Sequence, residues 1–348
     1  MLKTLDIHRK FGDLMYFTEE KKAKLIELAR ITEKEFPGQN QYYKRFLAIN
    51  AFKANKDVDV EAINSLMKFM KMNTKLFSPF RSNRFIFSSL LQMSYKHPED
   101  AFIRIRDHID LLKANGFKKA QFQPMMCYTL DSLLFADKIQ DMAIQTESYR
   151  VSVVEKAKEV YEHMKANHPW ITGGDDYGLA LIIAHANKDM DRVESMYEGL
   201  HNRGLKKGND LQSLANILSL TEDNESDIIE RVLEFMEISK TKGLKINTTM
   251  YSGLGLIALV ENDHKHLEHV IEVTNELKKT KKYKWLDKKL LFMFAVAIIS
   301  EELKYELSTK TIMETTLAVT IEELIMAQTA VMIAAITATT AASTAGSV

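Results

Sequence analysis

The sequence predicts an all-α protein built from a row of helical hairpins, and two observations support this fold class. The first is composition, because 13 Gly and 5 Pro among 348 residues are too few for the turns of a β-protein of this length. The second is periodicity. Apolar residues recur at i, i+3, i+4 and i+7 in segment after segment, which places them on one side of an α-helix.

The apolar stripe is followed each time by a short polar break and a second apolar segment. The stripes run over 63–70, 105–112, 157–164, 193–200, 229–236 and 270–277, and the breaks fall near Thr74, Gly116, His168, Gly204, Gly243 and Lys281. Three breaks contain a glycine, which suits the left-handed conformation that ends a helix because it has no Cβ to clash. Each stripe is therefore expected to be the first helix of a hairpin.

Successive breaks are separated by 42, 52, 36, 39 and 38 residues, the size of one helix-turn-helix unit. A single hairpin cannot bury its own stripe, so neighbouring hairpins are expected to stack on a shared core. The prediction is an α-solenoid-like array of degenerate repeats of roughly 36–42 residues, with an irregular helical bundle as the alternative. We divide it into N-terminal helices with a capping hairpin (1–60), the array (61–305), and a closing helix with an Ala/Thr-rich tail (306–348).

Charge and cysteine content restrict the class of protein. Lys+Arg and Asp+Glu are both 47, whereas a dedicated nucleic-acid-binding protein usually has a basic excess. The single cysteine, Cys127, excludes an internal disulfide and favours a reducing compartment. The first 17 residues contain charges throughout and do not resemble a signal peptide. We expect a cytoplasmic protein without a cofactor.

One loop is a candidate metal site. Asp175 and Asp176 are adjacent in the Gly-rich stretch 172–177, with His168 before them and His185 after them. Carboxylate and imidazole groups in this arrangement can hold a cation or a metal-bound water. The alternative is helix capping, because the corresponding breaks of the next two hairpins also supply Asp, Asn or Thr.

A basic run near residue 280 is a candidate nucleic-acid contact. It combines lysines with two aromatic residues: Lys278, Lys281, Lys282, Tyr283, Lys284 and Trp285. Lysines neutralise phosphates and aromatic rings stack on bases. The alternative is a solvated turn, because lysines also complement the dipole at a helix C-terminus.

The segment 324–342 contains no charge and is just long enough to span a bilayer. Ala and Thr dominate its second half, Gln328 interrupts it, and no basic residue follows it. A closing helix with a frayed end is the preferred interpretation. Contact with a membrane or with a partner helix is the alternative.

Three stretches together resemble a known family. They are Trp170–Ala184, Lys207–Leu220 and Ala327–Ile336. The resemblance is to the bacterial proteins catalogued as domain of unknown function 4003, and it covers most of the chain. It implies a bacterial, cytosolic protein, and it brings no activity, cofactor or catalytic residue with it.

The function favoured by the sequence is a non-enzymatic interaction or scaffold protein whose partner is a protein or peptide. The predicted hairpin array supports it by analogy with other helical arrays. A metal-dependent enzyme or cation-binding protein centred on 172–177 is one alternative. A membrane-associated adaptor acting through the apolar C-terminal segment is another.

Overall fold

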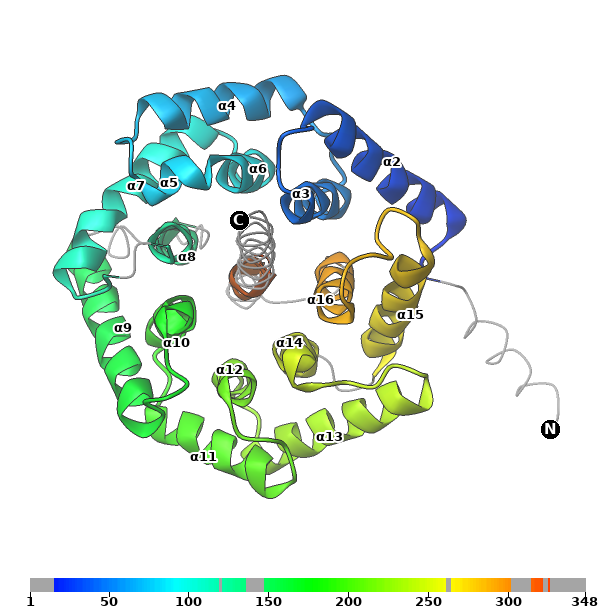
Figure 1. Ribbon diagram of the computed structural model, residues 1–348. Helices are drawn as coiled ribbons and strands as arrows, with labels where there is room; N and C mark the ends of the chain where they lie inside the picture. Colours follow the sequence, from blue (N-terminus) through cyan, green and yellow to red (C-terminus); the bar gives the residue numbers. More distant parts are fainter. Residues whose placement is uncertain are drawn as a thin grey trace, which may run out of the picture.

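The computed structural model describes residues 16–118, 121–135, 147–260, 264–301, 314–321 and 325, and all regular secondary structure in these residues is helical. The prediction of an all-α chain of stacked helical hairpins is confirmed. Within the described residues, seven outer helices alternate along the chain with seven inner helices, and each outer helix forms a hairpin with the inner helix that follows it (Figure 1).

The outer helices are α2 (Glu19–Glu35), α4 (Val60–Met72), α7 (Pro98–Ala114), α9 (Glu147–Asn167), α11 (Met190–Asn202), α13 (Glu225–Thr241) and α15 (Lys265–Lys279). The inner helices are α3 (Gln41–Lys53), α6 (Arg84–Ser94), α8 (Gln123–Phe135), α10 (Tyr177–His185), α12 (Asn209–Leu218), α14 (Tyr251–Val260) and α16 (Lys288–Ile299). Short helices α5 (Pro79–Ser82), η1 (Gly174–Asp176) and η2 (Thr248–Met250) precede three of the inner helices.

The hairpins close into a ring, a feature that the predicted solenoid-like array does not include (Figure 1). The first inner helix, α3, packs against the last one, α16. On the outer side, Lys22 of α2 forms an ion pair of 2.9 Å with Glu276 of α15. The backbone N–H groups of Tyr16 and Phe17 donate to the Glu272 carboxylate at 3.1 and 2.9 Å.

The inner helices are apolar on nearly all sides because protein surrounds them. In α16, every residue from Leu290 to Ile299 is buried. Helical residues 314–321 lie in the middle of the ring, where Leu317, Val319 and Ile321 are buried (Figure 1). A Cβ placed on Gly178 of α10 would come within 2.8 Å of Val319, so this glycine allows the close approach of the central segment.

The outer helices end where the sequence places the polar breaks. Gly116, Gly204 and Gly243 have φ values of +86°, +99° and +80°, the conformation that glycine adopts most readily. Asp287 caps α16 by accepting a hydrogen bond of 2.8 Å from the Leu290 N–H. The hairpin turns are therefore closed by the local signals that predict them.

The ring has two faces that carry different loops. The hairpin face carries the loops that lead from an outer helix to its inner helix, namely 36–40, 73–83, 115–122, 168–176, 203–208, 242–250 and 280–287. The return face carries the loops from an inner helix to the next outer helix, including 54–59, 95–97, 186–189 and 219–224.

Among the described helices, none combines the length and the apolar character that crossing a bilayer requires. Of the uncharged segment 324–342, only Ile325 lies within the described residues, and its side chain is buried. The predicted roles of the rest of that segment fall outside the described residues.

Candidate functional site

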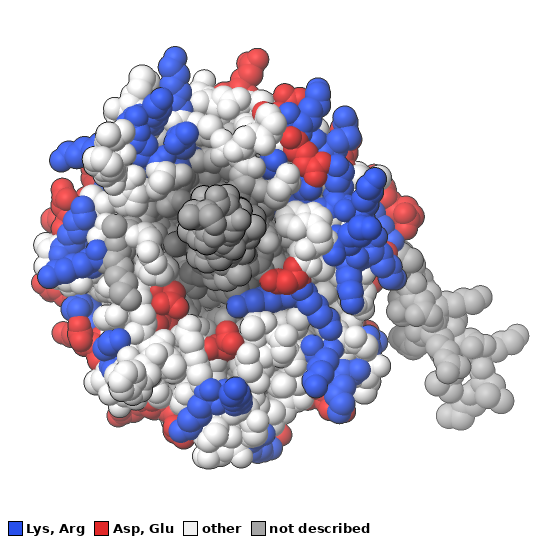
Figure 2. All heavy atoms as spheres, viewed as in Figure 1, with Lys and Arg blue, Asp and Glu red and all other residues white. Residues whose placement is uncertain are grey.

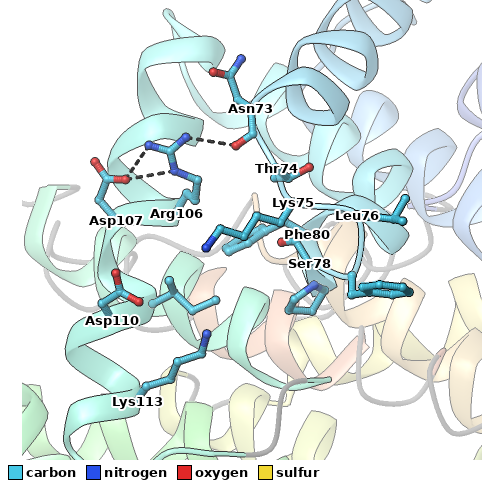
Figure 3. A pocket seen from close by; sticks show the side chains of 13 residues that line it. Asn73, Thr74, Lys75, Leu76, Ser78, Phe80, Arg106, Asp107, Asp110 and Lys113 are labelled. Atoms are coloured by element: carbon cyan, nitrogen blue, oxygen red, sulfur yellow. Dashed lines mark hydrogen bonds and ion pairs between the residues drawn. The ribbon is translucent and has the colours of Figure 1, made fainter.

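A cleft of about 580 Å³ opens on the hairpin face between the loop after α4 and the outer helix α7 (Figure 3). One wall is formed by residues 73–80, and the other by the side of α7 that carries Arg106, Asp110 and Lys113. Lys75 reaches from the loop toward α7. Polar and apolar side chains both line its walls.

The loop wall of the cleft is held in place by hydrogen bonds to neighbouring backbone. Thr74 Oγ1 donates to the Met70 carbonyl at 2.7 Å, and Arg81 donates to the carbonyls of Lys71 and Thr74 at 3.0 and 3.2 Å. Below the loop, Phe80 is completely buried against Phe87 and Phe102. The loop is therefore fixed from beneath rather than left to fluctuate.

This fixed loop nevertheless exposes apolar side chains. Phe77 is 94% exposed and Leu76 is 67% exposed, and Met72 at the end of α4 is 68% exposed. Apolar side chains this exposed and this close together are characteristic of contact surfaces. The loop therefore presents an apolar surface that needs little ordering before a partner binds.

Some charged side chains of the cleft have hydrogen-bond partners among the described residues and others do not. Arg106 donates to the Asp107 carboxylate at 2.7 Å and to the Asn73 carbonyl at 3.1 Å (Figure 3). Lys75 and Lys113 form no ion pair with another described residue. Asp110 also lines the cleft and forms no ion pair with another described residue. The cleft therefore offers two uncommitted ammonium groups and one carboxylate beside an apolar rim, which suits a carboxylate next to an apolar group.

The candidate metal residues have other partners in the structure. Asp176 Oδ2 accepts a hydrogen bond of 2.7 Å from the Gly173 N–H at the start of η1, as expected for a cap. Asp175 accepts from Asn209 at 3.2 Å, His168 contacts Glu194 at 2.8 Å, and His185 contacts the Tyr149 hydroxyl at 3.4 Å. Among the described residues, no three His, Cys, Asp or Glu side chains are grouped as metal ligands would be. Cation binding by this loop stays a prediction.

The basic run near residue 280 forms part of the ring closure. The Lys282 carbonyl accepts a hydrogen bond of 2.8 Å from Arg45 Nε, and the Lys282 ammonium pairs with Glu33. Tyr283 is fully buried and Trp285 is 44% exposed. Lys278, Lys281 and Lys284 are exposed to solvent. Lys282 and Tyr283 are thus engaged in packing, and contact of the run with nucleic acid stays a prediction.

Glu33 receives hydrogen bonds from both Lys282 and the buried Arg45. Burial alone would raise the pKa of this carboxyl group, but the two hydrogen bonds and the attraction of the two cations outweigh it and lower the pKa. The three side chains form a charged cluster that joins α2 and α3 to the loop after α15.

A second charged cluster lies between α7 and α8. Its residues are not among the candidates predicted from the sequence. The Asp131 carboxylate is fully buried and accepts hydrogen bonds from Arg104 at 2.7 and 2.9 Å and from the Tyr95 hydroxyl at 2.9 Å. His108 Nε2 lies 3.4 Å from it, and Arg150 lies 3.3 Å from His108 Nδ1. Because Arg150 can only donate, Nδ1 accepts and Nε2 carries the proton that faces Asp131.

Asp131 is held ionised by these partners. Burial would raise its pKa, but the hydrogen bonds from His108, Arg104 and Tyr95 outweigh burial and lower the pKa. A charge within the apolar stretch 125–134 was the sequence signal that could have revealed the cluster. Since the carboxylate oxygens are occupied by neighbouring donors, the geometry fits a structural cluster rather than a proton-transfer site.

The described helices thus form a closed ring of helical hairpins with a cleft and exposed apolar side chains on the hairpin face. Residues 30–330 match the family described as protein of unknown function (DUF4003), and the chain belongs to this family. A relative is the uncharacterized protein YeaA of Bacillus subtilis (strain 168), which is 28% identical over 305 residues, 85% of this chain and 88% of the relative. No solved structure matches the chain.

Proposed function

We propose that the protein is a non-enzymatic interaction protein of the bacterial cytoplasm that binds a segment of a partner protein in the hairpin-face cleft. The observation that carries the proposal is the fixed loop 73–80, which exposes Leu76 and Phe77 beside the uncommitted Lys75 and Lys113. A matching partner segment presents an apolar side chain next to a carboxylate.

The physical argument for a protein partner is the combination of rigidity and exposure. Burial of apolar side chains stabilises a complex by about 25 cal/mol for each Å² removed from water. A loop that is already ordered loses little conformational entropy on binding, so more of this stabilisation is retained as affinity. The lysines at the edge favour one orientation and select acidic partners.

The proposal is tested by capturing partners from cells of the source bacterium with the tagged full-length protein and identifying them by mass spectrometry. The test variant is Leu76→Ser with Phe77→Ser, which removes the apolar rim but leaves the anchor Phe80 in place. The matched control is Ile26→Ser, because Ile26 is also an exposed apolar residue, at 38%, and lies on α2 away from the cleft.

We expect at least one protein to be captured by the parent protein and by the Ile26→Ser variant, and its recovery to fall about tenfold or more with the cleft variant. Circular dichroism verifies that each variant is folded. Capture of the same proteins in the same amounts by all three forms would show that the cleft is not the contact surface.

A further inference from the structure

The two ends of the outer helices differ in charge. Each of the seven outer helices described has an acidic residue in its first turn, and six of them have a lysine in the last turn, where α11 has His201. This is the arrangement that complements a helix dipole. Because each outer helix ends at a loop of the hairpin face, these lysines lie toward that face.

The loops of the hairpin face add further basic charge. Their exposed lysines that form no ion pair with another described residue are Lys75, Lys118, Lys206, Lys245, Lys281 and Lys284. The acidic residues of the same loops are largely engaged, since Asp176 caps η1, Asp287 caps α16 and Asp175 contacts Asn209. Figure 2 looks onto this face and shows Lys and Arg side chains around its rim, with Asp and Glu side chains among them.

The return face carries more exposed acidic residues. They are Asp57, Glu61, Glu99, Asp100, Asp189, Asp191 and Asp227, and exposed lysines of the same face are Lys56 and Lys96. Although the formal net charge of the chain is zero, the loops of the hairpin face therefore have a surplus of unpaired lysines that those of the return face do not have. A field of this kind orients the whole molecule as it approaches a charged surface.

Apolar side chains project from the same basic face. Trp170 is 96% exposed, Phe77 94%, Met72 68%, Leu76 67% and Trp285 44%. In the part of the chain that the structure describes, Ile26 is the one further large apolar side chain with comparable exposure. The five lie at or next to the turns of the second, fourth and seventh hairpins, so they are spread around the rim of the hairpin face.

From these observations we infer that the hairpin face docks on the surface of an anionic lipid membrane. Lysines near such a surface are attracted by the lipid charge, and Trp and Phe side chains settle at the level of the headgroups. Anchors spread around the rim of a ring match an extended membrane surface better than a nucleic-acid strand, which follows a groove. Met72 and Leu76 also offer no ring for stacking on bases but insert readily among acyl chains.

The central segment has a direction that agrees with this docking. Glu314 lies 3.5 Å from Lys53, at the return-face end of α3, whereas Val319 lies against Gly178, at the hairpin-face end of α10. The segment therefore runs toward the basic face.

Sedimentation with vesicles tests the inference on the full chain. The probes are vesicles of phosphatidylglycerol mixed with phosphatidylcholine, and vesicles of phosphatidylcholine alone. We expect binding to the anionic vesicles only, and weaker binding as the salt concentration rises. Equal binding to both kinds of vesicle, or to neither, would overturn the inference.

Matched variants assign the docking face. Reversing two charges with Lys281→Glu and Lys284→Glu is expected to weaken binding at least about tenfold, because each lysine strengthens binding about fivefold. Trp170→Ser is expected to weaken it about threefold or more. The controls are Lys96→Glu, an exposed lysine of the return face, and Ile26→Ser, and neither is expected to change binding by more than about twofold.

None of these variants alters the cleft, so the vesicle result and the partner-capture result are independent. If the controls weaken vesicle binding as much as the test variants do, the hairpin face is not the docking face. An RNA oligonucleotide is added to the anionic vesicles as a competitor. If it displaces the protein at a concentration well below that of the lipid, nucleic acid is the preferred partner and the membrane inference is wrong.

Discussion

Asp131 shows how one residue carries a charge inside the wall of the ring. Its carboxylate is fully buried, yet Arg104, Tyr95 and His108 supply donors on several sides. Arg104 remains 35% exposed, so one member of the pair keeps contact with water. Breaking a buried ion pair by removing one partner is costly, because the remaining charge loses its compensation.

Replacement of Asp131 by Ala is therefore expected to lower the free energy of unfolding by about 2–4 kcal/mol. Asp107→Ala serves as the control, because Asp107 is an exposed partner of Arg106 on the same helix, and its loss is expected to cost less than about 0.5 kcal/mol. Urea denaturation monitored by circular dichroism measures both. Similar losses for the two variants would show that the buried cluster contributes no more than a surface pair.

The lowered pKa of Asp131 also predicts a pH dependence. A carboxyl group whose pKa is lower in the folded state binds fewer protons there than in the unfolded chain, so its stabilisation is present above the ordinary pKa and is lost as pH falls through the folded value. Asp131→Asn removes this contribution. Below about pH 4, stability of the parent protein is therefore expected to decline more steeply than that of the Asn variant.

At the scale of single elements, the sequence predicts most of the fold. The stripe of each outer helix and the glycine or polar break after it are local signals, and the helices end where those signals lie. Ring closure leaves no such signal, because it joins Arg45 to Lys282, residues 237 positions apart. Because the sequence does not reveal this closure, the basic run near residue 280 suggests a nucleic-acid contact. In the structure, Lys282 and Tyr283 of this run pack at the closure instead.

The contact between α10 and the central segment 314–321 also cannot be predicted from apolar periodicity. A methyl group on Gly178 would lie 2.8 Å from Val319 Cγ1, so Gly178→Ala is expected to destabilise the protein by about 1–3 kcal/mol. Val319→Ala should relieve the clash. In a double-mutant cycle the two substitutions together are expected to cost less than the sum of the single effects.

Gly38→Ala provides the reference for this cycle, because a Cβ at Gly38 meets nothing within 4 Å. Thermal unfolding of the four forms and of the reference measures the coupling. Additive effects of Gly178→Ala and Val319→Ala would contradict direct packing of the central segment against α10.

For the whole molecule, closure converts a row of hairpins into a ring with two distinct faces. An open row would leave the apolar sides of its first and last inner helices exposed, and terminal repeats of open arrays need a polar outer side. In this chain α3 and α16 cover each other instead, and the cluster of Glu33, Arg45 and Lys282 lies at the seam. The seam therefore determines whether the hairpin face is one continuous surface.

Arg45→Met tests the seam directly, because it keeps much of the side-chain volume but removes the charge shared by Glu33 and the Lys282 carbonyl. We expect a loss of about 2–4 kcal/mol in the free energy of unfolding. Amide hydrogen exchange is expected to accelerate in α2, α3, α15 and α16 before it does so in α9–α12, on the opposite side of the ring (Figure 1). Arg30→Met, in an exposed pair with Glu27 on α2, is the control and should leave the exchange pattern unchanged. Uniform acceleration around the ring in the Arg45 variant would mean that apolar packing of α3 on α16, rather than the charged cluster, keeps the ring closed.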